Sequence, residues 1–205
     1  SASNRGSSFA EFPKKWLEGR ETLPCLGPRI AFRDISRSTD TRTLRAALLP
    51  GHVFLANTAP YLLWPRGEAH DQAFLLGVLC SRCLDWYARR FVETHVSFFV
   101  FSPFPIPRPP GHHPLRTRVV DLTAQLAAQD RRFTAWAKPF GLKPRKLAPD
   151  EQADLIAELD AAVAHLYGLA EADLVHIFET FHEGWDYQDR LDATLKHFAK
   201  LRSIA

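Results

Sequence analysis

A proline-rich stretch, SPFPIPRPP at 102–110, divides this chain into two parts with different residue patterns. Proline lacks the amide hydrogen that a strand ladder or a helix interior needs, so the chain must leave regular structure there. We therefore expect a rigid extended connector over 102–113. Short strand patterns precede the connector and helical spacing follows it, which together predict an α+β fold.

A hairpin is predicted at the start of the first part. Residues 29–36 alternate, with Ile30 and Phe32 on one side and arginines on the other, which is the period of a half-buried strand. Residues 41–49 repeat this alternation, and the turn-forming residues 37–40 join the two. We expect arginines on the open face of this hairpin.

Further strands and one helix complete the predicted first part. Pro50 and Gly51 break the chain. Residues 70–92 are apolar nearly all round at helical spacing, which predicts a helix buried against the sheet. Three more short segments carry strand patterns, at 52–57, 60–64 and 95–101.

Helical spacing governs the second part. Pro114 is a favourable first residue of a helix, Gly168 is a favourable stop, and Asp186 is a candidate N-cap. A basic loop is expected at 138–146. The predicted helices cover 114–133, 149–168, 171–181 and 187–202.

The predicted architecture is a small, mainly antiparallel sheet packed on a buried helix, followed by a helical C-terminal subdomain. The sequence lacks methionine, even at position 1, and opens with SASNRGSS, so we expect a fragment of a longer protein that begins with a tag or linker. The expected divisions are a leading segment at 1–24, an α+β subdomain at 25–113 and a helical subdomain at 114–205.

The charge of the chain is unevenly distributed. Residues 1–149 hold 22 Lys and Arg against 11 Asp and Glu, whereas residues 150–205 hold 4 against 12. The overall charge of +3 therefore conceals a basic part of +11 and an acidic part of −8. Such asymmetry is typical of a protein whose basic part faces a polyanion, although two solvated faces would give the same totals.

Several classes of protein and site are disfavoured by the sequence. A run of roughly 18 apolar residues and a signal peptide are both absent, so we expect a cytoplasmic protein without a membrane partner. Cys25, Cys80 and Cys83 are expected to be reduced thiols, because their number is odd and two lie in a predicted helix. Cys80 and Cys83 resemble half a zinc site but lack a second pair at ligand spacing, so we expect no metal. Their conceivable histidine partners are His70, His95, His112 and His113.

Four stretches carry a family resemblance. They are RIAFRDISRSTDTRTLRAAL at 29–48, HVSFFVFSPFPIP at 95–107, ELDAAVAHLYGL at 158–169 and IFETFHEGWDYQDRL at 177–191. Together they resemble, in order, the C-terminal target-recognition region of type IIG-like restriction-modification adenine-N6 DNA methyltransferases and related phage-defence methylases. The resemblance implies that this region reads a double-stranded DNA sequence beside an upstream domain of the same polypeptide, which binds S-adenosylmethionine and methylates adenine.

The catalytic motifs of that family are missing from this chain. It contains neither an Asn-Pro-Pro-Tyr-type tetrapeptide nor a glycine-rich cofactor loop, and Pro149-Asp150 is not followed by the Glu-x-Lys of a nuclease. We therefore expect no cofactor and no catalytic residue here, and a monomer for the isolated chain.

The candidate DNA-binding residues are mostly arginines of the predicted hairpin. Guanidinium groups grip phosphates or bridge guanine O6 and N7, but each arginine could instead pair with Asp34 or Asp40 to hold the hairpin. The asparagine that ends the 52–57 segment either contacts adenine or closes a turn, and the basic loop either binds phosphate or is merely solvated. The candidates are Arg29, Arg33, Arg37, Arg42, Arg45, Asn57, Lys143 and Arg145.

The aromatic segment at 95–101 also has two interpretations. Phe98, Phe99 and Phe101 could stack on an extruded base, but alternation within a strand favours core packing. His95 is expected to satisfy a backbone group at the strand edge. For the chain as a whole, the alternative to DNA recognition is a protein-interaction module of a defence complex with incidental DNA contact. A second alternative, a stand-alone enzyme, is disfavoured because the sequence supplies no catalytic cluster.

Overall fold

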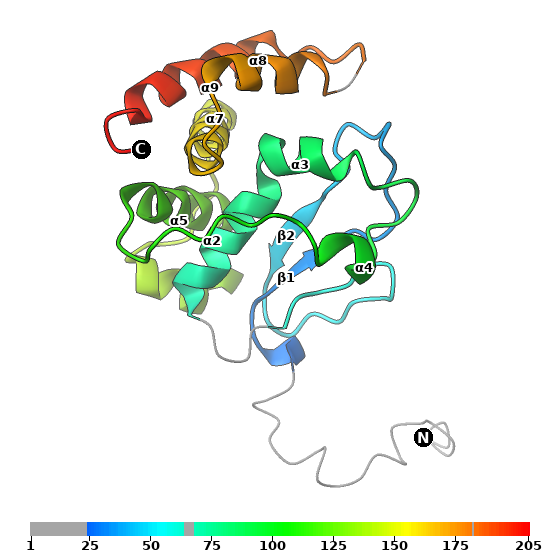
Figure 1. Ribbon diagram of the computed structural model, residues 1–205. Helices are drawn as coiled ribbons and strands as arrows, with labels where there is room; N and C mark the ends of the chain where they lie inside the picture. The colour runs from blue at the N-terminus through cyan, green and yellow to red at the C-terminus, as the bar shows by residue number, and fades with distance from the viewer. Residues whose placement is uncertain (1–23, 64–67, 182) are drawn as a thin grey trace, which may run out of the picture.

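A computed structural model describes residues 24–63, 68–181 and 183–205 (Figure 1). The predicted leading segment therefore lies outside the described residues except for Pro24, which opens the short 3-10 helix η4 (Pro24–Leu26). The fold is α+β as predicted, with a small antiparallel sheet and a helical C-terminal part. Within the described ranges, no helix is both long and apolar enough to cross a membrane.

The predicted hairpin forms, but its strands are shorter and more deeply buried than expected. Strands β1 (Arg29–Phe32) and β2 (Ala46–Leu49) pair antiparallel, with Ile30 opposite Leu48. All four residues of β1 are buried. The predicted exposure of Arg29 on an open face is therefore wrong, since Val53 and the ring of Tyr61 cover that end of the hairpin.

The strands predicted at 52–57 and 60–64 are absent from the described part, although the second segment does line the edge of β1. The amide of Phe32 donates to the Pro60 carbonyl at 2.9 Å, and the amide of Leu62 donates to the Ile30 carbonyl at 2.8 Å. Pro60 cannot donate in return, so the ladder stays limited to a single bridge between Ala31 and Tyr61. Trp64 lies outside the described residues.

The helix predicted over 70–92 is two helices, α2 (Ala69–Cys80) and α3 (Arg82–Ala88). Ser81 has extended backbone angles and caps α3, because its hydroxyl accepts a hydrogen bond from the amide of Leu84 at 3.3 Å. The amide of Arg82 donates to the buried carboxylate of Asp160 at 2.8 Å. These two acceptors stabilise a helix start inside what is otherwise a continuous apolar pattern.

The strand predicted at 95–101 is wrong, because residues 98–101 form the single-turn helix α4 (Phe98–Phe101). Only the preceding main chain pairs with the extension of β1, where the amide of Val96 donates to the Asp34 carbonyl at 2.7 Å. The i, i+3 spacing of a helical turn directs Phe98 and Phe101 to one side. Both rings contact Phe32, with centroids 5.5 and 4.6 Å away, so packing on β1 favours the helical turn.

The second part of the chain is helical, as predicted. Gly168 ends the long helix with a φ of 68°, as expected of a C-terminal glycine. The first helix ends earlier than predicted, because Asp130 starts a 3-10 turn by accepting from the Arg132 amide. Asp186 is not the cap of the last helix, whose cap position is Tyr187 without a side-chain bond. The elements are α5 (Pro114–Ala127), η5 (Arg131–Phe133), α6 (Thr134–Ala137), η6 (Lys138–Phe140), α7 (Pro149–Leu166), α8 (Glu171–Glu179) and α9 (Gln188–Leu201).

Helix α2 joins the two predicted subdomains. Figure 1 shows it between the sheet and the helices α5 and α7, and one cluster of buried apolar side chains extends from β1 to α9. A Cβ atom at Gly77 would lie 2.3 Å from Thr123 Oγ1 and 2.9 Å from Val119 Cγ1 of α5. Gly77 therefore permits the close approach of α2 and α5 on which this shared core depends.

A valine at position 77 tests this close contact. Gly77→Val is expected to lower the free energy of unfolding by about 1–3 kcal/mol, because the added methyl groups overpack the α2–α5 contact. Chemical denaturation followed by circular dichroism measures the change. Gly111→Val is the matched control, since nothing lies within 4 Å of a Cβ atom at that position. Equal stability of the two variants would show that α2 and α5 are not closely packed.

Candidate nucleic-acid interface

The connection between β1 and β2 presents two of the predicted arginines side by side. The amide of Arg33 donates to the Arg45 carbonyl at 3.0 Å, which extends the hairpin ladder by one pair. Directly opposed residues of an antiparallel pair point to the same face. The guanidinium groups of Arg33 and Arg45 lie 3.9 and 4.0 Å from the same oxygen of Asp40, and their side chains are 46% and 42% exposed.

The positive charge of a third arginine in this connection is balanced even less by nearby carboxylates. Arg37 is exposed and meets Asp40 through its main chain: its amide lies 3.5 Å from the carboxylate, and its carbonyl accepts from the Asp40 amide at 3.1 Å. The other nearby carboxylate, Asp34, lies 3.1 Å from Nδ1 of His95. The carboxylate of Asp40 thus lies near two guanidinium groups, while the Arg37 side chain is not paired with it. We call the group formed by Arg33, Arg37 and Arg45 the arginine tip.

A buried carboxylate holds the connection in place. Asp85 of α3 has no solvent exposure, and its Oδ1 accepts from the amides of Thr43 at 3.0 Å and Leu44 at 2.7 Å. Its Oδ2 lies 3.3 Å from Nε of Arg42, which also donates to the Cys80 carbonyl at 2.7 Å. The predicted DNA-binding residue Arg42 is therefore turned inward, where it balances the charge of Asp85.

Two further arginines, Arg82 and Arg89, donate hydrogen bonds to main-chain carbonyl groups of the connection. Arg82 lies 4.3 Å from the ring centroids of both Phe181 and Trp185 and donates to the Thr41 carbonyl at 3.3 Å. Burial, followed by the nearby guanidinium groups, lowers the pKa of Arg82 to about 9. Arg89 donates to the carbonyl groups of Ser38 and Asp40, and burial lowers its pKa as well.

Sequence reasoning missed this supporting network. The signal available was the carboxylate of Asp85, in the middle of the apolar pattern of the predicted helix and close in the sequence to three arginines. A buried acid in such a pattern requires partners, and the arginines of α3 and of the connection supply them.

The remaining candidates do not join the arginine tip. Arg29 is 4% exposed and donates to the Val53 carbonyl, so it is unavailable to a ligand. Asn57 is exposed in a turn that the Ala59 amide closes on the Ala56 carbonyl at 3.0 Å. This turn is next to the tip, because the amide of Asp34 donates to the Thr58 carbonyl at 3.0 Å.

The predicted basic loop lies elsewhere. Lys143 is exposed, while Arg145 forms two hydrogen bonds with Glu151, which lower the pKa of that carboxyl group. Figure 1 places η6 and the chain after it on the far side of α2 from the sheet. The basic loop at 138–146 and the arginine tip therefore do not form one continuous basic surface.

The cysteines that resembled half a zinc site are part of the packing between α2, α3 and β2. The Cys80 thiol donates to the Ala46 carbonyl at 3.4 Å, and burial raises the pKa of Cys80 and of Cys83. Across the ranges that the structure describes, no three His, Cys, Asp or Glu side chains are grouped as metal ligands would be.

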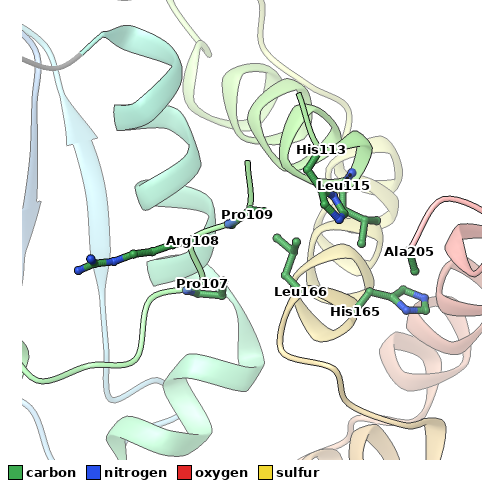
Figure 2. A pocket seen from close by; sticks show the side chains of 8 residues that line it. All are labelled: Pro107, Arg108, Pro109, His113, Leu115, His165, Leu166 and Ala205. Atoms are coloured by element: carbon green, nitrogen blue, oxygen red, sulfur yellow. Dashed lines mark hydrogen bonds between the residues drawn. The ribbon is translucent and has the colours of Figure 1, made fainter. Parts of the chain in front are cut away.

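A hollow of about 350 Å³ between the proline-rich connector and α7 is not a basic site (Figure 2). The side chain of Arg108 points away from His113 and His165, the two histidines that line the hollow. His113 caps α5 by accepting from the Leu115 amide at 3.2 Å, and Nε2 of His165 lies 2.8 Å from the Phe198 carbonyl. His113 thus stabilises the start of α5, and His165 joins α7 to α9.

Comparison of the chain with protein-family models, with curated proteins and with solved structures finds no match. The arginine tip is the exposed basic cluster that the structure brings together from the predicted residues. Its candidates are Arg33, Arg37 and Arg45, with Asn57 beside them.

Removal of the Asp85 charge tests how the tip is held. Asp85→Asn is expected to lower the free energy of unfolding by about 3 kcal/mol, because it leaves the partly buried guanidinium of Arg42 without its counter-charge. Asp121→Asn, a change at an exposed carboxylate of α5, is the control and should cost less than about 0.5 kcal/mol. Denaturant titration of both variants measures the difference, and equal stability would exclude a supporting role for Asp85.

Proposed function

We propose that this chain is the sequence-reading part of an adenine-N6 DNA methyltransferase of a restriction-modification or phage-defence system. The observation that carries the DNA-binding role is the arginine tip, in which Arg33 and Arg45 share the single carboxylate of Asp40 and the exposed Arg37 meets it only through its main-chain amide. Double-stranded DNA is a polyanion, and it releases counterions when guanidinium groups neutralise its phosphates.

The form of the tip supports contact with a duplex. A two-stranded ribbon fits the major groove of B-DNA, where an arginine can contact guanine O6 and N7 together. Arg33 and Arg45 stand on one face of such a ribbon, and the exposed amide of Asn57 lies in the neighbouring turn. Asn57 suits the N6 and N7 atoms of adenine, so the tip combines side chains for both purines.

The methyltransferase assignment rests on the resemblance of the stretches at 29–48, 95–107, 158–169 and 177–191. We assign S-adenosylmethionine binding and methyl transfer to the upstream domain, and no residue of this chain to that chemistry. The proposed partners are double-stranded DNA and that domain, in the cytoplasm, with the isolated chain as a monomer.

The acidic C-terminal part is consistent with this division of roles. Residues 150–205 carry a net charge of −8, so their surface repels a duplex and favours approach through the basic part. The competing proposal, a protein-interaction module with incidental DNA contact, predicts a weak DNA affinity that does not depend on the arginine tip.

Salt dependence of binding tests the proposal. The purified chain is expected to bind duplex DNA with an affinity that falls steeply between about 50 and 200 mM salt. Arg33→Ala, Arg37→Ala and Arg45→Ala should each lower the slope of log affinity against log salt by about 1 if they contact phosphate, or cost about 1–3 kcal/mol at one base pair if they read a base. Fluorescence anisotropy at several salt concentrations separates the two roles.

The matched control is Arg202→Ala, which removes a 69% exposed arginine from the acidic C-terminal part. This variant should bind duplex like the unchanged chain. Unaltered affinity and slope in all three tip variants, with their folding intact, would remove the arginine tip from the DNA interface and favour the protein-interaction module.

A further inference from the structure

An open aromatic hollow lies at the end of α3. It has a volume of about 670 Å³, and the residues that line it include four aromatic ones and Ser102. Two of the rings face solvent, since Phe99 is 90% exposed and Phe91 is 55% exposed. Contiguous apolar surface of this kind is uncommon on a monomeric protein unless it binds something. The rings belong to Tyr87, Phe91, Phe99 and Phe104.

The walls of the hollow are anchored in the core. The ring of Tyr87 lies 4.8 Å from Phe91 and 6.2 Å from Phe104. Phe104 in turn contacts Phe101, which stacks on the buried Phe32 of β1 at 4.6 Å. This succession of ring contacts fixes the positions of Tyr87 and Phe104. The hollow is therefore a preformed surface with one freely exposed ring, Phe99, at its edge.

The hollow adjoins the segment that carries the arginine tip. The chain between Phe91 and Phe99 pairs with the extension of β1, where Ile35 forms a bridge with His95 and the amide of Ser36 donates to the Thr94 carbonyl at 3.1 Å. Figure 1 shows α4 and the connection from α3 on the same side of the molecule as the sheet.

We propose that this hollow binds an unpaired nucleobase of the DNA strand whose phosphates lie on the arginine tip. Nucleobases are flat and apolar on their faces and stack on aromatic side chains, whereas their phosphates require nearby cations. The hollow offers exposed rings, and the adjoining segment carries the arginine tip, a combination that matches a nucleotide better than a purely apolar protein segment. This inference rests on the proposed DNA-binding function and adds that the chain holds a base outside the duplex stack.

Fluorescence of 2-aminopurine tests the inference. The probes are a single strand and a duplex with one unpaired 2-aminopurine, and a fully paired duplex is the reference. Binding of the chain should quench the unpaired probe by stacking. Phe99→Leu should abolish the quench and weaken binding of the single strand about 5- to 100-fold, while affinity for the fully paired duplex stays unchanged. Phe91→Leu should have the same effect.

The control is Phe54→Leu, which removes an 85% exposed phenylalanine from a segment outside the hollow and should leave quenching intact. Salt-dependent duplex binding without quenching, or quenching that survives in both hollow variants, would overturn the inference and leave the proposed function standing. Absence of any salt-dependent DNA binding would overturn both. Dimerisation of the chain in sedimentation analysis that Phe99→Leu abolishes would instead assign the hollow to a second copy.

Discussion

Two carboxylates without solvent exposure, Asp85 and Asp160, organise the described part of this molecule. Asp160 of α7 accepts from the first amide of α3 and from the guanidinium of Arg190 on α9. Asp85, one turn further along α3, accepts from the amides of Thr43 and Leu44 in the hairpin connection. Burial of a charge is costly unless partners compensate it, so each carboxylate fixes the elements that supply its partners. Helix α3 thereby couples the C-terminal helices to the proposed DNA-binding surface.

This coupling gives a physical reason for an ordered arginine tip. A long connection between two short strands would otherwise lose conformational entropy when it bound a ligand. Here the amides of Thr43 and Leu44 and the carbonyl groups of Thr41 and Ser38 already bond to α3. Arg42, Arg82 and Arg89 point inward and bind Asp85 or main-chain carbonyl groups of the connection. The arginines of the tip point outward and stay available for DNA in the proposed function.

The sequence predicted the elements whose pattern is local. Helix α7 was predicted with its start at Pro149 and its stop at Gly168, because caps and apolar spacing agree there. The break at Ser81 and the helical turn at Phe98 were not predicted, since they depend on the carboxylate of Asp160 and the ring of Phe32, far away in the chain. The roles of the arginines also depend on tertiary contacts. Arg42 has the alternation phase of the buried Leu44 and Arg45 has the opposite phase, but the carboxylate that receives Arg42 lies on α3, far away in the chain.

Hydrogen exchange with and without duplex DNA tests most directly whether buried carboxylates preform a DNA-binding tip. In the free chain, the amides of Thr43 and Leu44 should exchange slowly because Asp85 accepts both. Duplex DNA should then slow exchange across 33–45 and leave 143–151 unchanged. Rapid exchange at Thr43 and Leu44 in the folded free chain would contradict the preformed tip. Protection by DNA at 143–151 alone would contradict its role in binding.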